Sequence, residues 1–63
     1  MPPTTGVTTL ICDDEPIARA GLRQMLASYD WIRVVGEAPH GLAAVEAINH
    51  QQPELVFLDI QMP

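Results

Sequence analysis

The hydrophobic residues of this chain fall into five blocks with two kinds of spacing. Three short blocks, at residues 7–12, 32–35 and 55–59, consist mainly of apolar and β-branched residues, which is typical of strands buried in a parallel sheet. The longer blocks between them, at residues 16–28 and 42–51, repeat apolar residues every three or four positions, as amphipathic helices do. The chain is therefore predicted to alternate strand, helix, strand, helix and strand.

The helical blocks also predict which residues face the sheet. In the first helix the apolar stripe comprises Ile17, Ala18, Gly21, Leu22, Met25, Leu26 and Tyr29. Arg19 and Arg23 lie away from this stripe, so they are expected on a solvated face. In the second helix the residues expected to point inward are Val45 and Ile48, with Ala44 and Ala47 beside them. Residues 36–41, before this helix, are rich in helix and strand breakers and are predicted to form a turn.

Short links between alternating strands and helices predict a parallel sheet with right-handed crossovers. With one helix on each face, the first strand lies in the middle and the strand order is 2-1-3. This order places the carboxyl ends of the first and third strands side by side, at the point where open α/β sheets bind ligands. Asp13 and Asp14 follow the first strand and Asp59 closes the third, so the three carboxylates are predicted to meet at this edge.

Three neighbouring carboxylates repel one another, and a hard divalent cation would relieve that repulsion. Mg²⁺ is usually held by one or two carboxylates while it keeps waters and binds a phosphate oxygen. With such an ion beside it, Asp59 could attack phosphorus and form an aspartyl phosphate. Simpler roles stay open at this point. Asp13 and Asp14 could cap the first helix, and Asp59 could be a solvated acid at the end of a strand.

Length and charge narrow the choice of partners. A chain of 63 residues allows one small domain, and its net charge of −5 without any lysine disfavours direct binding to nucleic acid or to an anionic membrane. The one cysteine, Cys12, cannot form an internal disulfide and fits a buried strand in a reducing compartment. Residues 1–6 are expected to be a flexible leader without the features of a signal peptide, so a cytoplasmic location is expected.

Three motifs at the ends of the predicted strands carry a resemblance to a known family. They are Asp-Asp-Glu-Pro at residues 13–16, Val-Gly-Glu-Ala at residues 35–38 and Phe-Leu-Asp-Ile-Gln-Met-Pro at residues 57–63. In order and spacing they resemble the receiver domain of bacterial two-component response regulators. The resemblance implies a flavodoxin-like (CheY-like), doubly wound α/β fold, of which residues 7–63 would form the amino-terminal half.

The same resemblance assigns roles to individual residues. Carried over by position, Asp59 is the phosphoacceptor of a phosphorelay, and a sensor histidine kinase is the implied phosphoryl donor. The residues implied to bind Mg²⁺ are Asp13, Asp14, Asp59 and Gln61, the last through its backbone carbonyl. The chain is thus expected to be a phosphoacceptor module and not an enzyme.

The remaining parts of the family's structure are expected to lie beyond Pro63. The family's fourth and fifth strands carry a hydroxyl residue and a lysine that respond to the phosphoryl group, and this chain contains no lysine. The motifs look most like those of regulators with a LytTR DNA-binding output, and regulators with a LuxR-type helix-turn-helix output are the second choice. Transcription regulation is therefore expected through an output domain outside these residues, without direct DNA contact by the chain itself.

A different class of function stays open beside this one. The chain could be an inactive truncated remnant, or a small acidic protein that binds Mg²⁺ or pairs with another chain through its third strand. An apolar strand with a free edge favours such self-association. Covalent labelling of Asp59 by a phosphoryl donor distinguishes the two classes, because only a receiver is expected to be labelled.

Overall fold

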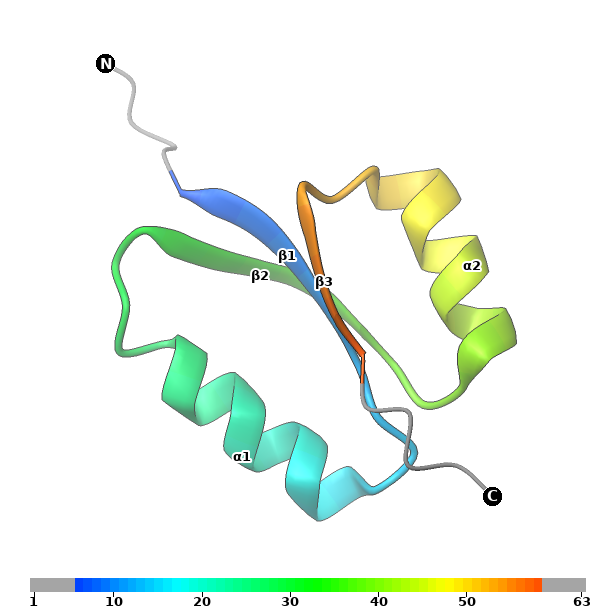
Figure 1. The fold of residues 1–63 in the computed structure, drawn as a ribbon, viewed down its shortest axis with the longest axis horizontal. Coiled ribbons are helices and arrows are strands. Elements are labelled where there is room, and N and C mark those ends of the chain that lie inside the picture. Colours follow the sequence, from blue (N-terminus) through cyan, green and yellow to red (C-terminus); the bar gives the residue numbers. More distant parts are fainter. Residues whose placement is uncertain (1–5, 59–63) are drawn as a thin grey trace.

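The computed structural model describes residues 6–58, which form three strands and two helices in the predicted alternating order (Figure 1). Their bounds are β1 (Val7–Cys12), α1 (Pro16–Leu26), β2 (Ile32–Ala38), α2 (Gly41–Gln51) and β3 (Leu55–Leu58). Residues 1–5 of the predicted leader and residues 59–63 lie outside the described part of the chain. Within that part, neither helix has the length and apolar character needed to cross a membrane.

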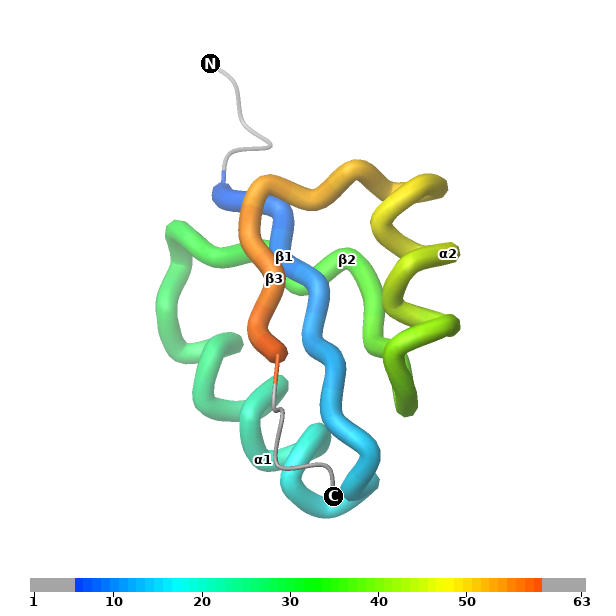
Figure 2. The backbone as a smooth tube through the Cα atoms, turned by 45° about the vertical axis from the view of Figure 1, so that its right-hand side comes forward, coloured from blue at the N-terminus to red at the C-terminus, as the bar shows by residue number. Residues whose placement is uncertain are grey.

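The sheet has the predicted strand order, β2-β1-β3, and both pairs of strands are parallel. β1 lies in the centre, with α1 on one side of the sheet and α2 on the other (Figure 1 and Figure 2). At the carboxyl end of β1, Cys12 pairs with Ala38 of β2 and with Leu58 of β3. The described strands therefore end at the same edge of the sheet.

β2 is longer than the local pattern predicts, because residues 36–38 continue the strand instead of forming a turn. They pair with residues 10–12 of β1, and this pairing gives hydrogen-bond partners to backbone N–H and C=O groups that a turn would leave without them. The register shifts between Thr9 and Leu10, so that Val35 is an extra residue of β2, as in a β-bulge. Glycine suits the next position, because a Cβ atom on Gly36 would lie 3.2 Å from Cδ1 of Leu10.

The core between the sheet and α2 is built largely from small side chains. Its buried residues are Leu10, Cys12, Ala38 and Ala44, and the partly buried residues packed against them are Ala43, Ala47 and Val56. The prediction that Val45 and Ile48 point inward is wrong, because these side chains are 55% and 38% exposed. The alanines form the contacting face of α2, since small side chains let a helix approach a sheet closely. The larger residues flank that face.

α1 packs against β1 and β2 on the opposite side of the sheet. Of its predicted apolar stripe, Leu26 is buried and Leu22 is partly buried, whereas Ile17 and Met25 are 84% and 56% exposed. The predicted stripe therefore has the correct period but is wider than the surface that β1 and β2 cover.

Local chemistry sets the ends of the helices. Pro16 begins α1, where its missing N–H removes no helical hydrogen bond, and the helix ends at Leu26, ahead of the predicted end at residue 28. α2 begins after His40, whose Nδ1 accepts a hydrogen bond from the backbone N–H of Ala43 at 3.2 Å. Gln52 ends α2 in the left-handed conformation, with a φ of 47°.

Replacing Leu10 by alanine is expected to lower the free energy of unfolding by about 2–5 kcal/mol, because Leu10 is fully buried and the truncation leaves a cavity. Urea unfolding followed by circular dichroism measures this change. Leu42→Ala is the matched control, since Leu42 is exposed on α2 and its truncation is expected to change the same free energy by less than about 0.5 kcal/mol. Equal effects of the two substitutions would contradict the placement of Leu10 in the core.

Candidate functional site

The carboxyl edge of the sheet is where the sequence predicts an acidic site. Cys12 of β1 pairs with Leu58 of β3; in the sequence, Asp13 follows Cys12 and Asp59 follows Leu58. The register thus brings the two residues that directly precede the aspartates side by side, as the strand order predicts. Asp59 and Gln61 themselves lie outside the described residues, so their roles stay predictions.

Asp13 is a buried acid with a defined orientation. It is 5% exposed, and its backbone N–H donates to the carbonyl of Ala38 at 3.1 Å. Its Oδ1 accepts a hydrogen bond from the backbone N–H of Glu15 at 2.9 Å. Its backbone carbonyl accepts a hydrogen bond from Nη1 of Arg19 at 2.7 Å. Backbone and side-chain hydrogen bonds together therefore hold Asp13 in place.

Asp14 has a different environment although it is the next residue. It is exposed, and it forms no salt bridge with another residue in the range 6–58. The N-cap residue of α1 is Glu15, whose side chain makes no capping hydrogen bond. Asp13 binds the N–H of this N-cap residue itself, which closes the loop before the helix. The structure therefore does not favour the simple interpretation of Asp13 and Asp14 as helix caps.

The prediction that Arg19 and Arg23 lie on a solvated face is wrong for Arg19 and incomplete for Arg23. Both bind the carboxylate of Glu37 on β2. Nε of Arg19 donates to Oε1 at 3.1 Å, and Nη1 of Arg23 donates to Oε2. The side chains of Arg19 and Glu37 are only 20% and 28% exposed, whereas that of Arg23 is 56% exposed. Two arginines of α1 thus share one acid of the sheet.

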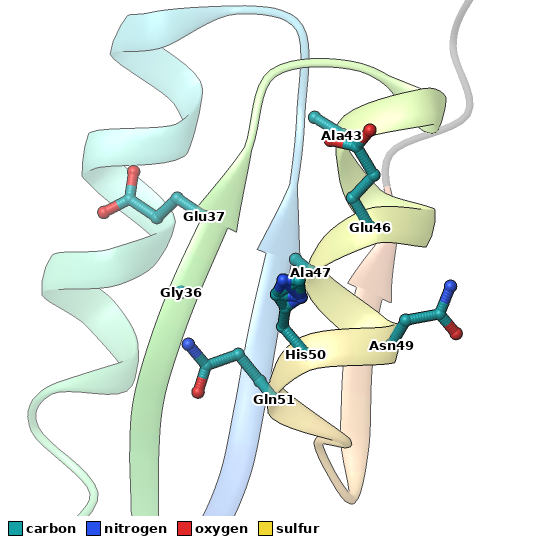
Figure 3. Close-up of a pocket in the computed structure, with 8 residues that line it drawn as sticks. All are labelled: Gly36, Glu37, Ala43, Glu46, Ala47, Asn49, His50 and Gln51. Atoms are coloured by element: carbon teal, nitrogen blue, oxygen red, sulfur yellow. The ribbon is translucent and has the colours of Figure 1, made fainter.

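The course of β2 explains why this pairing occurs. Ala38 packs in the core beside α2, and neighbouring residues of a strand point to opposite faces of the sheet, so Glu37 faces α1. Figure 3 shows the Glu37 side chain directed from β2 toward α1. Arg19 and Arg23 lie four positions apart, which places them on one face of the helix. The arginine spacing is visible in the sequence, but the partner is not, because the local pattern assigns Glu37 to a turn.

Cys12 lies directly before the acidic edge, which is the carboxyl end of the sheet with Asp13 and Asp14. It is buried, as expected of a small apolar residue in this strand. Burial and, as a smaller cause, the neighbouring charge of Asp13 raise the pKa of its thiol above the ordinary value of 9.0. The positive charge of Arg19 acts in the opposite direction on this pKa. Cys12 is therefore a buried packing residue at the carboxyl end of β1.

The described acids fit a hard cation that keeps part of its water shell. No group of three or more His, Cys, Asp or Glu side chains within residues 6–58 is arranged to hold a metal ion. Asp13 and Asp14 nevertheless supply two adjacent carboxylates, and no described arginine forms a salt bridge with either of them. One or two carboxylates with several waters are the usual protein contribution to a Mg²⁺ site. The oxygen donors at this edge therefore suit Mg²⁺.

A cavity of about 630 Å³ lies elsewhere, along β2 and α2 (Figure 3). Its lining residues are Gly36, Glu37, Ala43, Glu46, Ala47, Asn49, His50 and Gln51. Neither Asp13 nor Asp14 lines it, and the carboxylate of Glu37 is engaged by α1. The cavity is therefore distinct from the acidic edge.

Similar proteins of known sequence include two named as transcriptional regulators. The transcriptional regulatory protein BtsR of Salmonella typhi is 46% identical over 57 residues, and BtsR of Escherichia coli K12 is 42% identical over 57 residues. Each alignment covers 90% of this chain and 24% of the relative. The chain thus spans about a quarter of the length of these relatives.

Solved structures share the fold. The signal receiver domain of the putative response regulator NarL from Mycobacterium tuberculosis gives a TM-score of 0.87 at 37% identity, over 94% of this chain and 48% of that one. RcsB from Salmonella enterica serovar Typhimurium, bound to promoter rprA with phosphomimetic BeF3−, gives 0.84 at 29% identity, over 94% and 29% of the two chains. The predicted flavodoxin-like fold is therefore confirmed. Because the family model of the response regulator receiver domain also matches residues 9–63, this chain belongs to the receiver domain family of two-component response regulators.

Proposed function

We propose that this chain is the phosphoacceptor part of a two-component response regulator and that Asp59 receives the phosphoryl group. The observation that carries this proposal is the buried, hydrogen-bonded Asp13 at the end of the central strand, beside the strand that precedes Asp59 in the sequence. Burying an acid is costly unless hydrogen bonds or a cation compensate for it. Membership of the receiver family supports the same role.

The proposed phosphoryl donor is a phosphohistidine of a sensor histidine kinase. A carboxylate oxygen of Asp59 forms the new P–O bond, the P–N bond of the donor breaks, and the electron pair returns to the imidazole. Asp59 is the group that becomes modified. The chain is therefore proposed to act as a phosphoacceptor and not as an enzyme with turnover of its own.

The residues proposed to hold Mg²⁺ are Asp13, Asp14, Asp59 and Gln61, the last through its backbone carbonyl. When bound, the ion offsets the negative charge that a phosphoryl group brings to an acidic edge. Asp13 contributes a carboxylate that the backbone N–H of Glu15 orients, and Asp14 contributes an exposed one. The two residues thus offer one rigid and one adaptable ligand.

Control of transcription is proposed to reside in an output domain outside these 63 residues. The net charge of −5 and the absence of lysine support a separate DNA-binding domain, since this chain has few positive charges to neutralise the phosphates of DNA. The motifs around Asp13 and Asp59 favour a LytTR output, with a LuxR-type output as the second choice. The proposed location is the cytoplasm, where a receiver can meet the kinase domain of its sensor.

Incubation with a small acyl phosphate and Mg²⁺ is expected to add one phosphoryl group to the protein, and Asp59→Asn is expected to abolish this addition. The reason is that an amide cannot form the acyl phosphate. Intact-mass spectrometry measures the product. Asp30→Asn is the matched control, because Asp30 is an exposed acid in the connection between α1 and β2 and its loss leaves labelling unchanged. Labelling of the Asp59→Asn protein would overturn the assignment.

Asp13→Asn is expected to weaken Mg²⁺ binding by about 10-fold or more, since loss of even an outer-shell partner commonly costs that much affinity. Isothermal titration calorimetry with MgCl2 measures the dissociation constant. Glu46→Gln removes the same charge from the exposed side of α2 and is expected to leave that constant within about twofold, because solvent screens distant charges. Equal effects of the two substitutions would show that Asp13 is not a ligand.

One observation favours the alternative class, a chain without phosphotransfer that pairs with a second copy. Among the described residues β3 pairs only with β1, and Leu58 is 55% exposed. An apolar strand with an unpaired edge can accept a strand from another molecule.

Light scattering of the 63-residue chain at rising concentration tests this alternative. Edge pairing predicts a growing mass that Leu58→Lys abolishes, because a charge at the edge opposes pairing. Leu42→Lys, which alters an exposed residue of α2, is expected to leave the growth unchanged. A constant monomer mass would count against self-association.

A further inference from the structure

We propose that Arg19 is a positioning residue for the metal-binding carboxylate of Asp13 and that Glu37 holds Arg19 in place. This inference rests on the proposed Mg²⁺ site and extends it to residues on α1 and β2. Neither Arg19 nor Glu37 belongs to the acidic edge by sequence. The structure links both of them to Asp13 through hydrogen bonds.

Arg19 uses two different nitrogen atoms to bind two different elements. Its Nη1 donates to the backbone carbonyl of Asp13 at 2.7 Å, and its Nε donates to Oε1 of Glu37 at 3.1 Å. The guanidinium group is planar, so both directions are fixed with respect to each other. One side chain of α1 thus ties the loop after β1 to the neighbouring strand β2.

The hydrogen bond to the carbonyl of Asp13 bears directly on the direction of its carboxylate. The carbonyl belongs to the peptide group that joins Asp13 to Asp14, and Oδ1 of Asp13 binds the N–H of the following peptide, at Glu15. A rotation of the first peptide would move the N–H of Glu15 away from Oδ1. By fixing the carbonyl, Arg19 therefore stabilises the turn that orients the Asp13 side chain.

Glu37 also determines which acid the positive charge of Arg19 pairs with. An arginine near two carboxylates could pair with them and compete with a cation. Instead, Arg19 is paired with Glu37, whose second oxygen binds Arg23. The side chains of Arg19 and Glu37 are 20% and 28% exposed, so solvent screens their interaction only in part. Glu37 therefore keeps the guanidinium directed at the backbone carbonyl of Asp13 and away from the side-chain oxygens.

Two simpler roles for Arg19 predict different results. If Arg19 only lends a positive charge, its removal makes the acidic edge more negative and Mg²⁺ binds more tightly. If Arg19 only braces α1 against β2, its removal lowers stability and leaves the Mg²⁺ dissociation constant of the folded protein unchanged. Of the three roles, only positioning predicts weaker Mg²⁺ binding by a protein that is still folded.

The test compares Arg19→Gln, Arg19→Lys and Arg33→Gln in the intact protein. Arg33→Gln is the matched control, because Arg33 is exposed on β2 and pairs with Thr8, near the opposite end of β1 from Asp13. Isothermal titration calorimetry with MgCl2 gives the dissociation constants, and thermal unfolding verifies that each variant is folded. Both Arg19 variants are expected to bind Mg²⁺ about 10-fold more weakly, whereas Arg33→Gln stays within about twofold of the wild type. Lysine fails because one ammonium group cannot reproduce the two fixed donor directions.

A second measurement needs no metal ion. Amide hydrogen exchange at Glu15 reports on its hydrogen bond to Oδ1 of Asp13. This exchange is expected to become faster in both Arg19 variants and to stay unchanged in Arg33→Gln. If Arg19→Gln does not fold, Arg19→Lys decides the question by the same two measurements.

The outcomes separate this inference from the function on which it rests. If the wild type binds Mg²⁺ and the Arg19 variants bind it equally or more tightly, the positioning role is overturned and the proposed metal site is not. A wild-type protein that binds no Mg²⁺ would overturn the proposed metal site and this inference with it. Weaker binding together with faster exchange at Glu15 supports both.

Discussion

Pairing of β1 along both of its edges organises the described part of the chain. Leu10, Ile11 and Cys12 are fully or almost fully buried because a strand lies on each side and a helix on each face. The chain leaves this strand while still inside the protein, so Asp13 begins the next loop with only 5% of its surface exposed. A central strand therefore creates a buried acid, and the acid requires compensation.

Hydrogen bonds from three neighbouring segments hold Asp13, and one of them, from Glu15, reaches its carboxylate. The backbone of β2 accepts the N–H of Asp13, the loop supplies the N–H of Glu15 to its carboxylate, and α1 supplies the guanidinium of Arg19 to its carbonyl. Asp14, one residue later, is exposed. Two adjacent aspartates thus differ in hydrogen bonding and in solvation, a difference that is compatible with the proposed Mg²⁺ site.

The bulge in β2 connects the packing of the sheet with this acidic edge. The extra residue Val35 shifts the register, Gly36 makes room for Leu10, and the strand continues to Ala38. Glu37 therefore lies on the face that α1 covers and meets Arg19. The register of β2 after the bulge thus also determines which acid meets the arginine that binds Asp13.

The alternation of elements and the strand order 2-1-3 could be predicted from the sequence, because hydrophobic periodicity and short links are local properties. The family could be predicted as well, because its acidic motifs lie at the ends of the strands. The roles of Asp59 and Gln61 remain predictions from the sequence. Three features required the folded structure: residues 36–38 are a strand, the alanines of α2 face the core, and Arg19 binds Glu37. Strand pairing and side-chain burial depend on neighbours that are distant in the sequence, and no local pattern contains those neighbours.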